Sequence, residues 1–311
     1  MRSTLLDFIV CPQCLPAERP LILDDGQAEN GDLAFGTLAC PHCAARFAVS
    51  DGIADLRPFR SQPETPDRTA QDGIGYESQT QLAAYLWSHY ADLWGDPEAG
   101  AAYAAWTKRL RPAAGDMILD AGCAVGRLTL EAAASCGLAV GVDLSFSFIR
   151  TARTIARSGA LRFTLPLEGR LGQDIALRLP ERLRNVPAEF ILADVQALPF
   201  RRETFQAAAS CNIVDKVPNP LAHLRECQRV VASPGGFLLC DPFSWSEETT
   251  PAENWLGGTE ETGRALARIP RLLDEIPGWS ATAGEPVPWT IRHHANRFER
   301  IFSQTIQAQK T

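Results

Sequence analysis

The stretch ILDAGCAVGRL, residues 118–128, decides the fold. We expect a short apolar strand over Met117–Asp120, a loop that holds Gly122 and Gly126, and then a helix to about Ser135. Glycines between a strand and a helix let a ligand approach the backbone closely. A glycine loop alone is a weak signal, so the rest of the chain has to support it.

Strands and helices alternate after this loop. The alternation predicts an α/β domain with a parallel sheet and helices on both of its faces. A helical pattern precedes the loop, from Tyr76 to Arg111, where apolar residues repeat at spacings of three and four. The further strands are expected at 138–144, 189–195, 205–214 and 236–241, and the further helices through about 157 and over 220–231.

Polar side chains end several of these strands. Asp143 ends the second strand, where a carboxylate can accept from the two hydroxyls of a ribose, and Asp194 ends the third, where it can accept from an adenine amino group. Ligands bind at the carboxyl ends of strands in open α/β sheets, so we expect these side chains to meet at one site. The candidate cofactor-binding residues are Asp120, Gly122, Cys123, Gly126, Asp143, Leu144, Asp194, Val195 and Asn212.

The loop differs from the dinucleotide pattern G-x-G-x-x-G, because an acid precedes its first glycine. It resembles motif I of the class I methyltransferases, and the spacing to Asp143 and Asp194 agrees. The resemblance implies a Rossmann-like methyltransferase sheet that binds S-adenosylmethionine (SAM). Ala124 stands where that family usually has glycine. Cys123 could be considered a nucleophile, but no base is placed for it, so we assign it to the cofactor loop.

Two cysteine pairs with the spacing C-x-x-C lie near the N-terminus, and their ligand set is Cys11, Cys14, Cys40 and Cys43. Two such turns complete a tetrahedral site of four sulfurs, which leaves no open position for catalysis. We therefore predict a structural zinc ion and a small zinc ribbon over residues 1–58. A linker is expected over 59–74 and a methyltransferase domain over 75–311. The ribbon resembles the Trm112-like zinc ribbons through LLDFIVCPQC, CPHC and FAVSDGIADL, a group that serves methyltransferases as an accessory.

A loop after the last parallel strand carries two tryptophans and several acids. Aromatic walls with a few fixed polar groups are typical of small-molecule sites, so Trp245, Glu247 and Trp255 are candidate substrate-binding residues. The alternative is a surface loop with local packing.

The series YESQTQLAAYLWSHY, NIVDKVPNP, DPFSWSEETTPAENWLGG and VPWTIRHHANRFE resembles the methyltransferase domain at the C-terminus of the ovothiol-biosynthesis enzyme. The resemblance implies N-methylation of the imidazole of a thiol- or selenol-bearing histidine. A neutral imidazole has a free lone pair near pH 7, so a strong base is optional. The candidate catalytic residues are Asn212, Asp215, Tyr76, His89 and Tyr90. For His89 the alternative is packing on a helix face.

The formal net charge is -7, which argues against a general nucleic-acid binder. We find neither a signal peptide nor an apolar stretch able to span a membrane, and we expect a cytoplasmic protein. Two other functions stay open. Some rRNA methyltransferases pair a zinc ribbon with this fold, and a cofactor-binding scaffold could use the ribbon to dock a partner. The ribbon could also dimerise the protein or cap the active site.

Overall fold

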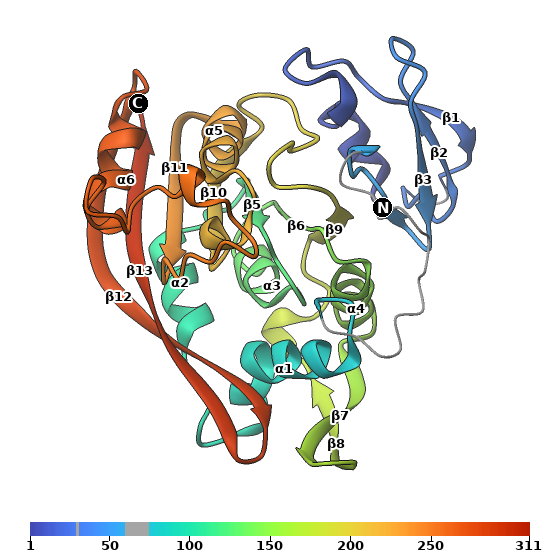
Figure 1. The fold of residues 1–311 in the computed structure, drawn as a ribbon. Helices are drawn as coiled ribbons and strands as arrows, with labels where there is room; N and C mark the ends of the chain where they lie inside the picture. The colour runs from blue at the N-terminus through green and yellow to red at the C-terminus, as the bar shows by residue number, and fades with distance from the viewer. Residues whose placement is uncertain (29–30, 60–74) are drawn as a thin grey trace.

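The computed structural model describes residues 1–28, 31–59 and 75–311, which form a large mixed sheet, a small N-terminal sheet and a separate hairpin (Figure 1). The expected linker 59–74 falls outside these residues except for Phe59. Among the described helices, none is both long and apolar enough to cross a bilayer.

The large sheet has seven strands in the order β12-β13-β11-β10-β5-β6-β9. The five strands from β11 to β9 in this order are parallel, and β13 runs antiparallel to both β11 and β12. The chain starts in the middle at β5, moves outward through β6 and β9, and then crosses to β10 on the other side of β5. This reversal creates a switch point between β5 and β10, which is where open α/β sheets bind ligands. The strands are β5 Met117–Ala121, β6 Leu138–Asp143, β9 Ala188–Leu192, β10 Phe205–Cys211, β11 Val231–Asp241, β12 Trp279–His294 and β13 Arg297–Lys310.

Helices cover both faces of the sheet, as the near-continuous burial of its parallel strands requires. Leu119 of β5 packs in the same buried cluster as helices α5 and α6, whereas its neighbour Ile118 packs with α2 and α3. Helix α4 packs on Phe190 of β9, on the same face as α3. The helices are α1 Gln79–Tyr90, α2 Ala102–Leu110, α3 Arg127–Ala133, α4 Phe146–Ser158, α5 Pro220–Val230 and α6 Ala265–Asp274, with short 3-10 turns η4 Ala91–Trp94, η5 Glu181–Leu183, η6 Val214–Lys216 and η7 Ala252–Asn254. The α/β fold with helices on both faces is thus confirmed.

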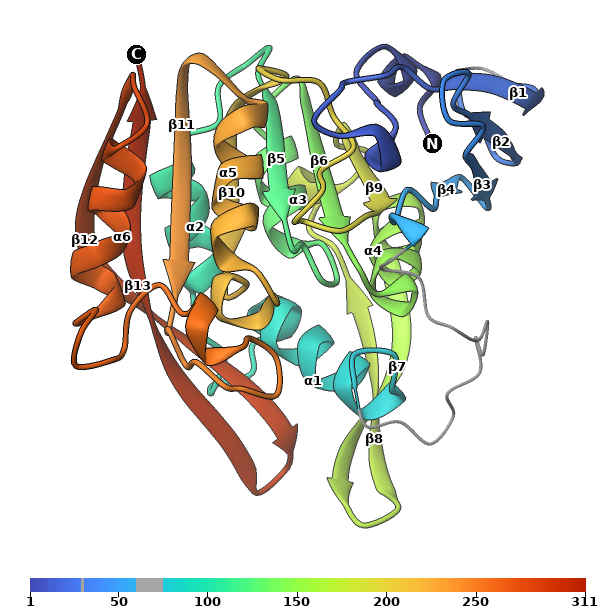
Figure 2. The same cartoon turned by 45° about the horizontal axis from the view of Figure 1, so that its top comes forward.

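The N-terminal unit is a four-stranded antiparallel sheet, preceded by two 3-10 turns. Its elements are η1 Ser3–Asp7, η2 Pro12–Cys14, β1 Ile22–Gly26, β2 Gly36–Ala39, β3 Arg46–Ser50 and β4 Ile53–Ala54. In Figure 2 this unit lies beside β9, the edge strand of the large sheet.

The N-terminal unit covers a part of the sheet that no helix covers. The connection from β9 to β10, residues 193–204, holds no helix, although parallel strands are usually joined through one. Leu5 and Ile9 instead share a buried cluster with Val142 of β6 and Ile191 of β9. Backbone bonds join the two units as well, since Leu56 N donates to Leu192 O at 2.8 Å and Val10 N donates to Pro199 O at 2.9 Å.

The helical pattern before the glycine loop forms two helices and not one. Helix α1 ends at Tyr90 and continues as η4, and Gly95 then takes a φ of 76°. That left-handed conformation suits glycine and ends the helix. Two hairpins were not anticipated: β7 Ala160–Glu168 with β8 Leu171–Arg178, and the long pair β12 and β13.

Candidate active site

One cavity lies at the carboxyl ends of the parallel strands and encloses about 980 Å³, including its open mouth. Helix α1 lies beyond these strand ends and contributes to the cavity wall (Figure 2). Eight of the nine expected cofactor residues line this cavity; they are Asp120, Gly122, Cys123, Asp143, Leu144, Asp194, Val195 and Asn212.

The glycine loop has a backbone that side chains at its two glycines would not permit. Gly122 has a φ of 85°, and a Cβ there would lie 2.2 Å from the side chain of Ile213. Gly126 begins α3 at a φ of 84°, and a Cβ there would lie 2.6 Å from Phe190. Gly122 lines the cavity, whereas Gly126 lies behind it and allows α3 to pack on the sheet. Both glycines are therefore required by the shape of the loop.

Asp143 lies at the end of β6, and each oxygen of its carboxylate already accepts one hydrogen bond. Its Oδ2 accepts from Ala124 N and its Oδ1 from Ser145 N, each at 2.9 Å. Burial raises the pKa of Asp143 to about 6, although these backbone donors oppose the shift. Each carboxylate oxygen has a further lone pair, so the group can still accept from a ligand's hydroxyls.

Asp120 and Asp194 complete the row of acids. Thr129 Oγ1 donates to Asp120 Oδ2 at 2.7 Å, and burial raises the pKa of Asp120 to about 7. Gln196 N donates to Asp194 Oδ1 at 2.8 Å. Because β5, β6 and β9 are neighbours, Asp120, Asp143 and Asp194 follow one another along the sheet edge.

Apolar and polar groups at the same edge fit a nucleoside cofactor. Leu144 lines the cavity and is 46% exposed, so an apolar part of a ligand can pack against it. Asn212 follows β10 with a φ of 59°, and its Oδ1 accepts from Ser303 Oγ at 2.6 Å. Three carboxylates that can accept hydrogen bonds, a tight glycine loop and an apolar side chain suit the hydroxyls of a ribose, an amino group and an adenine ring.

An aromatic wall forms the rest of the cavity. It consists of Tyr76, Tyr85, His89, Tyr103, Trp106 and Trp289, all of which line the cavity. The rings lie in a chain, with centroids 6.0 Å apart for Tyr76 and Tyr85, 5.9 Å for Tyr85 and His89, 4.4 Å for His89 and Tyr103, and 5.1 Å for Tyr103 and Trp106. Trp289 joins the chain from β12, at 6.2 Å from Tyr85.

His89 is the polar member of the wall. Burial, together with the nearby positive charge of Arg127, holds the pKa of His89 well below its ordinary value, so the ring is neutral at pH 7. Its Nδ1 is buried and has no hydrogen-bond partner among the described residues. A buried polar atom without a partner is costly and often marks the position of a ligand or a water molecule. His89 therefore packs within the wall with its Nδ1 unpaired among the described residues, and its part in catalysis stays a prediction.

Of the other residues predicted for catalysis, Tyr76 and Asn212 line the cavity, but Tyr90 and Asp215 do not. The Tyr90 hydroxyl donates to Val125 O at 2.7 Å in the interior. Asp215 is fully buried behind the cavity, where its Oδ2 accepts from Ser244 N at 2.7 Å.

The predicted substrate residues on the loop after β11 also lie outside the lining of the cavity. Trp245 and Trp255 stack on each other with centroids 6.3 Å apart, and Trp255 Nε1 donates to Thr250 O at 2.9 Å. Glu247 is exposed. In this conformation the loop packs locally, and the substrate role of its residues stays a prediction.

Several lining residues were not singled out from the sequence, namely Tyr85, Tyr103, Trp106, Gln196, Lys216 and Trp289. A signal existed for Tyr85, because it lies four residues before His89 and must share a helix face with it. Trp289 had no such signal, since only the long hairpin brings it to α1. Ser88 Oγ holds the two together by donating to Thr290 O at 2.7 Å.

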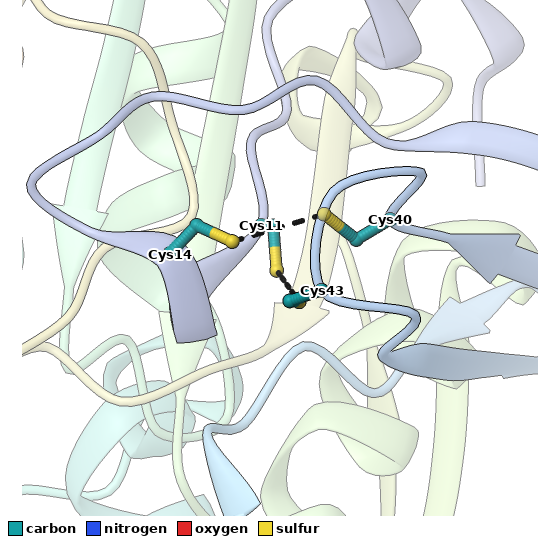
Figure 3. Close-up of side chains that lie close together, drawn as sticks. All are labelled: Cys11, Cys14, Cys40 and Cys43. Atoms are coloured by element: carbon teal, nitrogen blue, oxygen red, sulfur yellow. Dashed lines mark hydrogen bonds between the residues drawn. The ribbon is translucent and has the colours of Figure 1, made fainter.

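The four N-terminal cysteines converge as the spacing predicted (Figure 3). Cys11 and Cys43 have sulfurs 3.7 Å apart, and Cys14 and Cys40 have sulfurs 3.8 Å apart. All four sulfurs lie within 4.8 Å of one another. A tetrahedral zinc ion with bonds of about 2.3 Å needs sulfurs about 3.8 Å apart, so this arrangement fits zinc.

Residues 119–240 match a family described as a methyltransferase domain. The match begins in β5 and ends in β11, so it contains the glycine loop, the row of acids and Asn212. No curated protein sequence is significantly similar to the chain.

Solved structures with a related fold include the YcgJ protein of Bacillus subtilis, at 13% identity and a TM-score of 0.47 over 67% of this chain and 97% of that one. A putative methyltransferase of Bacillus halodurans has 14% identity and a TM-score of 0.43 over 68% and 99% of the two chains. The complex between the Haloferax volcanii Trm112 methyltransferase activator and a putative methyltransferase matches at 18% identity and a TM-score of 0.41, over 66% of this chain and 78% of that one.

Proposed function

From the premise that the chain is a SAM-dependent methyltransferase, we propose that it methylates a small aromatic acceptor. The specific acceptor that we propose is the imidazole nitrogen of a histidine that bears a thiol or a selenol. We also propose that the site residues named above hold SAM and the acceptor in the one cavity.

The observation that carries this proposal is the position of the aromatic wall. It lines the same cavity as the three acids that we assign to the cofactor. A wall of aromatic rings favours a flat ring as the occupant, because stacked and edge-to-face contacts add to the burial of apolar surface.

The charge of the cavity supports a small molecule over a nucleic acid. Its lining contains three aspartates and a single cationic side chain, Lys216, within the described part of the chain. An RNA substrate would require a basic surface to neutralise its phosphates.

The chemistry demands little of the protein beyond alignment. SAM supplies an electrophilic methyl group on a sulfonium, so the acceptor needs a lone pair presented in line with it. A neutral imidazole offers that lone pair at pH 7, because its ordinary pKa is about 6.5. We expect the aromatic wall to orient the ring, and Asn212 to bind at the point where cofactor and acceptor meet. Alignment alone can contribute roughly 7–11 kcal/mol to such a step.

The test is a methylation assay with the purified full chain. Labelled SAM is offered with mercaptohistidine, selenohistidine, histidine and total RNA in parallel, and mass spectrometry and NMR locate the methyl group. The matched control is the variant Asp143→Ala, which removes the carboxylate that we assign to the ribose.

The proposal predicts methyl transfer to a ring nitrogen of the thiol or selenol compound, and a strong loss of product with Asp143→Ala. Methylation of RNA with no methylation of any imidazole would refute the small-molecule assignment. It would leave the methyltransferase fold and its activity in place.

A further inference from the structure

We propose that Lys216 is the anchor for a carboxylate on the acceptor, which makes the acceptor a flat ring compound that carries a carboxylate. This inference rests on the proposed function, because it concerns the acceptor in the same cavity. It names a specificity-determining residue that the sequence did not single out.

The first support is the way in which the Lys216 side chain is held. Its Nζ lies 3.3 Å from Asp215 Oδ1, and Asp215 is itself fully buried. The Lys216 side chain is 34% exposed and lines the cavity. Asp215 Oδ1 has no hydrogen-bond partner among the described residues, so the contact is an ion pair and the donors of the ammonium stay available to a ligand.

Behind this pair the structure fixes Asp215 in place. Ser244 N donates to Asp215 Oδ2, and the neighbouring Asp241 accepts from Val214 N at 2.9 Å and from Phe243 N at 2.8 Å. Burial, followed by the negative charge of Asp215, raises the pKa of Asp241 well above its ordinary value. Asp215 and Asp241 are thus both held by backbone donors, and Asp215 is the carboxylate that pairs with Lys216.

The second support is the side of the switch point on which Lys216 lies. The acids that we assign to the cofactor lie at the carboxyl ends of β5, β6 and β9. Strands β6 and β9 lie on one side of β5. Lys216 belongs to η6, which follows β10 on the other side of β5. A cofactor that spans the acids leaves the β10 side of the cavity for the acceptor.

The third support is that Lys216 shares the cavity with the aromatic wall. Burial raises the pKa of Tyr76, and the positive charge of Lys216 partly opposes this shift. From Tyr76 the chain of rings continues through Tyr85 and His89 to Trp106. A molecule with an anionic end and a flat ring fits a cavity with these two features, with its carboxylate at Lys216 and its ring against the wall.

The experiment compares ring compounds that differ only in the carboxylate. The full chain is loaded with S-adenosylhomocysteine, and calorimetry measures its affinity for each acid and for the corresponding carboxamide. The pairs are those of mercaptohistidine, histidine and tryptophan. The variants are Lys216→Met and, as the matched control, Lys108→Met, because Lys108 is exposed on α2 and does not line the cavity.

We expect the wild type to bind at least one acid about tenfold or more tightly than its amide, as a charge-assisted hydrogen bond would give. In Lys216→Met the ratio falls to about one, and in Lys108→Met it is unchanged. A wild-type ratio near one for every pair overturns the proposal, and so does a ratio that survives in Lys216→Met. A loss confined to the affinity for S-adenosylhomocysteine also overturns it, because Lys216 would then serve the cofactor.

The two proposals fail separately. If only the tryptophan pair shows a ratio that depends on Lys216, the anchor stands and the histidine acceptor is wrong. If Lys216→Met does not fold because Asp215 loses its counter-ion, the double variant Asp215→Asn with Lys216→Met removes both charges and gives the same comparison. The acid-to-amide ratio of the wild type tests the anchor in either case.

Discussion

At the scale of single residues, the carboxylates at the strand ends are held in an unusual state. Asp120 is 3% exposed and Asp143 is partly buried, and burial raises their pKa values to about 7 and about 6. A buried carboxylate that is not matched by a cation is destabilising in its charged form. A cofactor with a positive charge and hydroxyl donors would relieve that cost.

This state predicts a pH dependence of cofactor binding. Both acids have a pKa raised above the unfolded value, so their contribution to stability is present at low pH and is lost as pH rises through about 6 to 7. SAM should bind the ionised forms, so its affinity should increase by about tenfold between pH 6 and pH 8. Calorimetric titration of the full chain at the two pH values checks this, and the SAM-induced increase in Tm should grow in the same direction. Equal affinity at both values would contradict the assignment of these acids to the cofactor.

The sequence was informative about residues that lie close to a strand end. Asp120, Asp143, Asp194 and Asn212 could be placed together because parallel strands bring their carboxyl ends to one edge. Tyr103, Trp106 and Trp289 could not, because their meeting depends on how α2 and a hairpin pack around α1. Tyr90 and His89 are adjacent on one helix, yet only His89 faces the cavity, and the direction of each side chain depends on tertiary packing.

At the scale of elements, the glycine loop carries one residue that strains it. Ala124 takes a φ of 45°, in the left-handed region, at the position where class I methyltransferases usually have glycine. Its N–H donates to Asp143, so the strained conformation is the one that aims the backbone at this carboxylate. A left-handed conformation costs a non-glycine residue roughly 1–2 kcal/mol.

Replacing this alanine should therefore be tolerated. Ala124→Gly removes the strain and loses about 0.8 kcal/mol from one buried methyl group, so the free energy of unfolding should stay equal or rise by up to about 1 kcal/mol. Ala132→Gly, at a buried position in the last turn of α3, is the matched control and should lower it by about 1 kcal/mol or more. Urea unfolding of both variants makes the comparison. If Ala124→Gly is as destabilising as Ala132→Gly, the strain assigned to this position is absent.

Elements with strong local signals were predicted closely, and those that depend on distant partners were not. The strand before the loop was expected over Met117–Asp120 and extends to Ala121, and the helix expected over 220–231 spans Pro220–Val230. The hairpin of β12 and β13 lacked a short turn signal, and its paired residues lie far along the sequence from the cofactor motif. The loop of Trp245 and Trp255 has the composition of a binding site, but its two rings stack on each other.

At the scale of the whole molecule, the ribbon takes the place of a crossover helix. It shares a buried cluster with β6 and β9 and hydrogen-bonds to the end of the edge strand. Ion pairs strengthen the contact, since Arg153 of α4 reaches both Asp32 of the ribbon and Glu189 of β9. The zinc ion that the four cysteines fit would thus support the core of the methyltransferase domain as well as the ribbon. The roles considered from the sequence were docking a partner, dimerising the protein and capping the active site, and these contacts add a structural role within its own chain.

Loss of the metal should therefore affect the whole chain. Cys43→Ser removes one of the four thiolates, and structural zinc sites contribute apparent binding energies of about 10–16 kcal/mol to folding. We expect the variant to lose its zinc, to unfold at lower temperature, and to aggregate through the exposed face and edge of the sheet. Metal analysis and size-exclusion chromatography measure these effects. Cys136→Ser, at a partly buried thiol outside the cluster, is the control and should keep one zinc ion per chain. A zinc-free variant that stays monomeric with unchanged Tm would show that the ribbon does not support the sheet.

The account depends on one cavity that holds cofactor and acceptor together. The measurement that tests this most directly is a crystal structure of the full chain with S-adenosylhomocysteine and mercaptohistidine bound. We predict the ribose at Asp143, the adenine beside Asp194 and Leu144, and the imidazole against Tyr85 and His89 with a ring nitrogen facing the cofactor sulfur. An acceptor bound at Trp245 and Trp255, or a cofactor bound away from Asp143, would contradict the account.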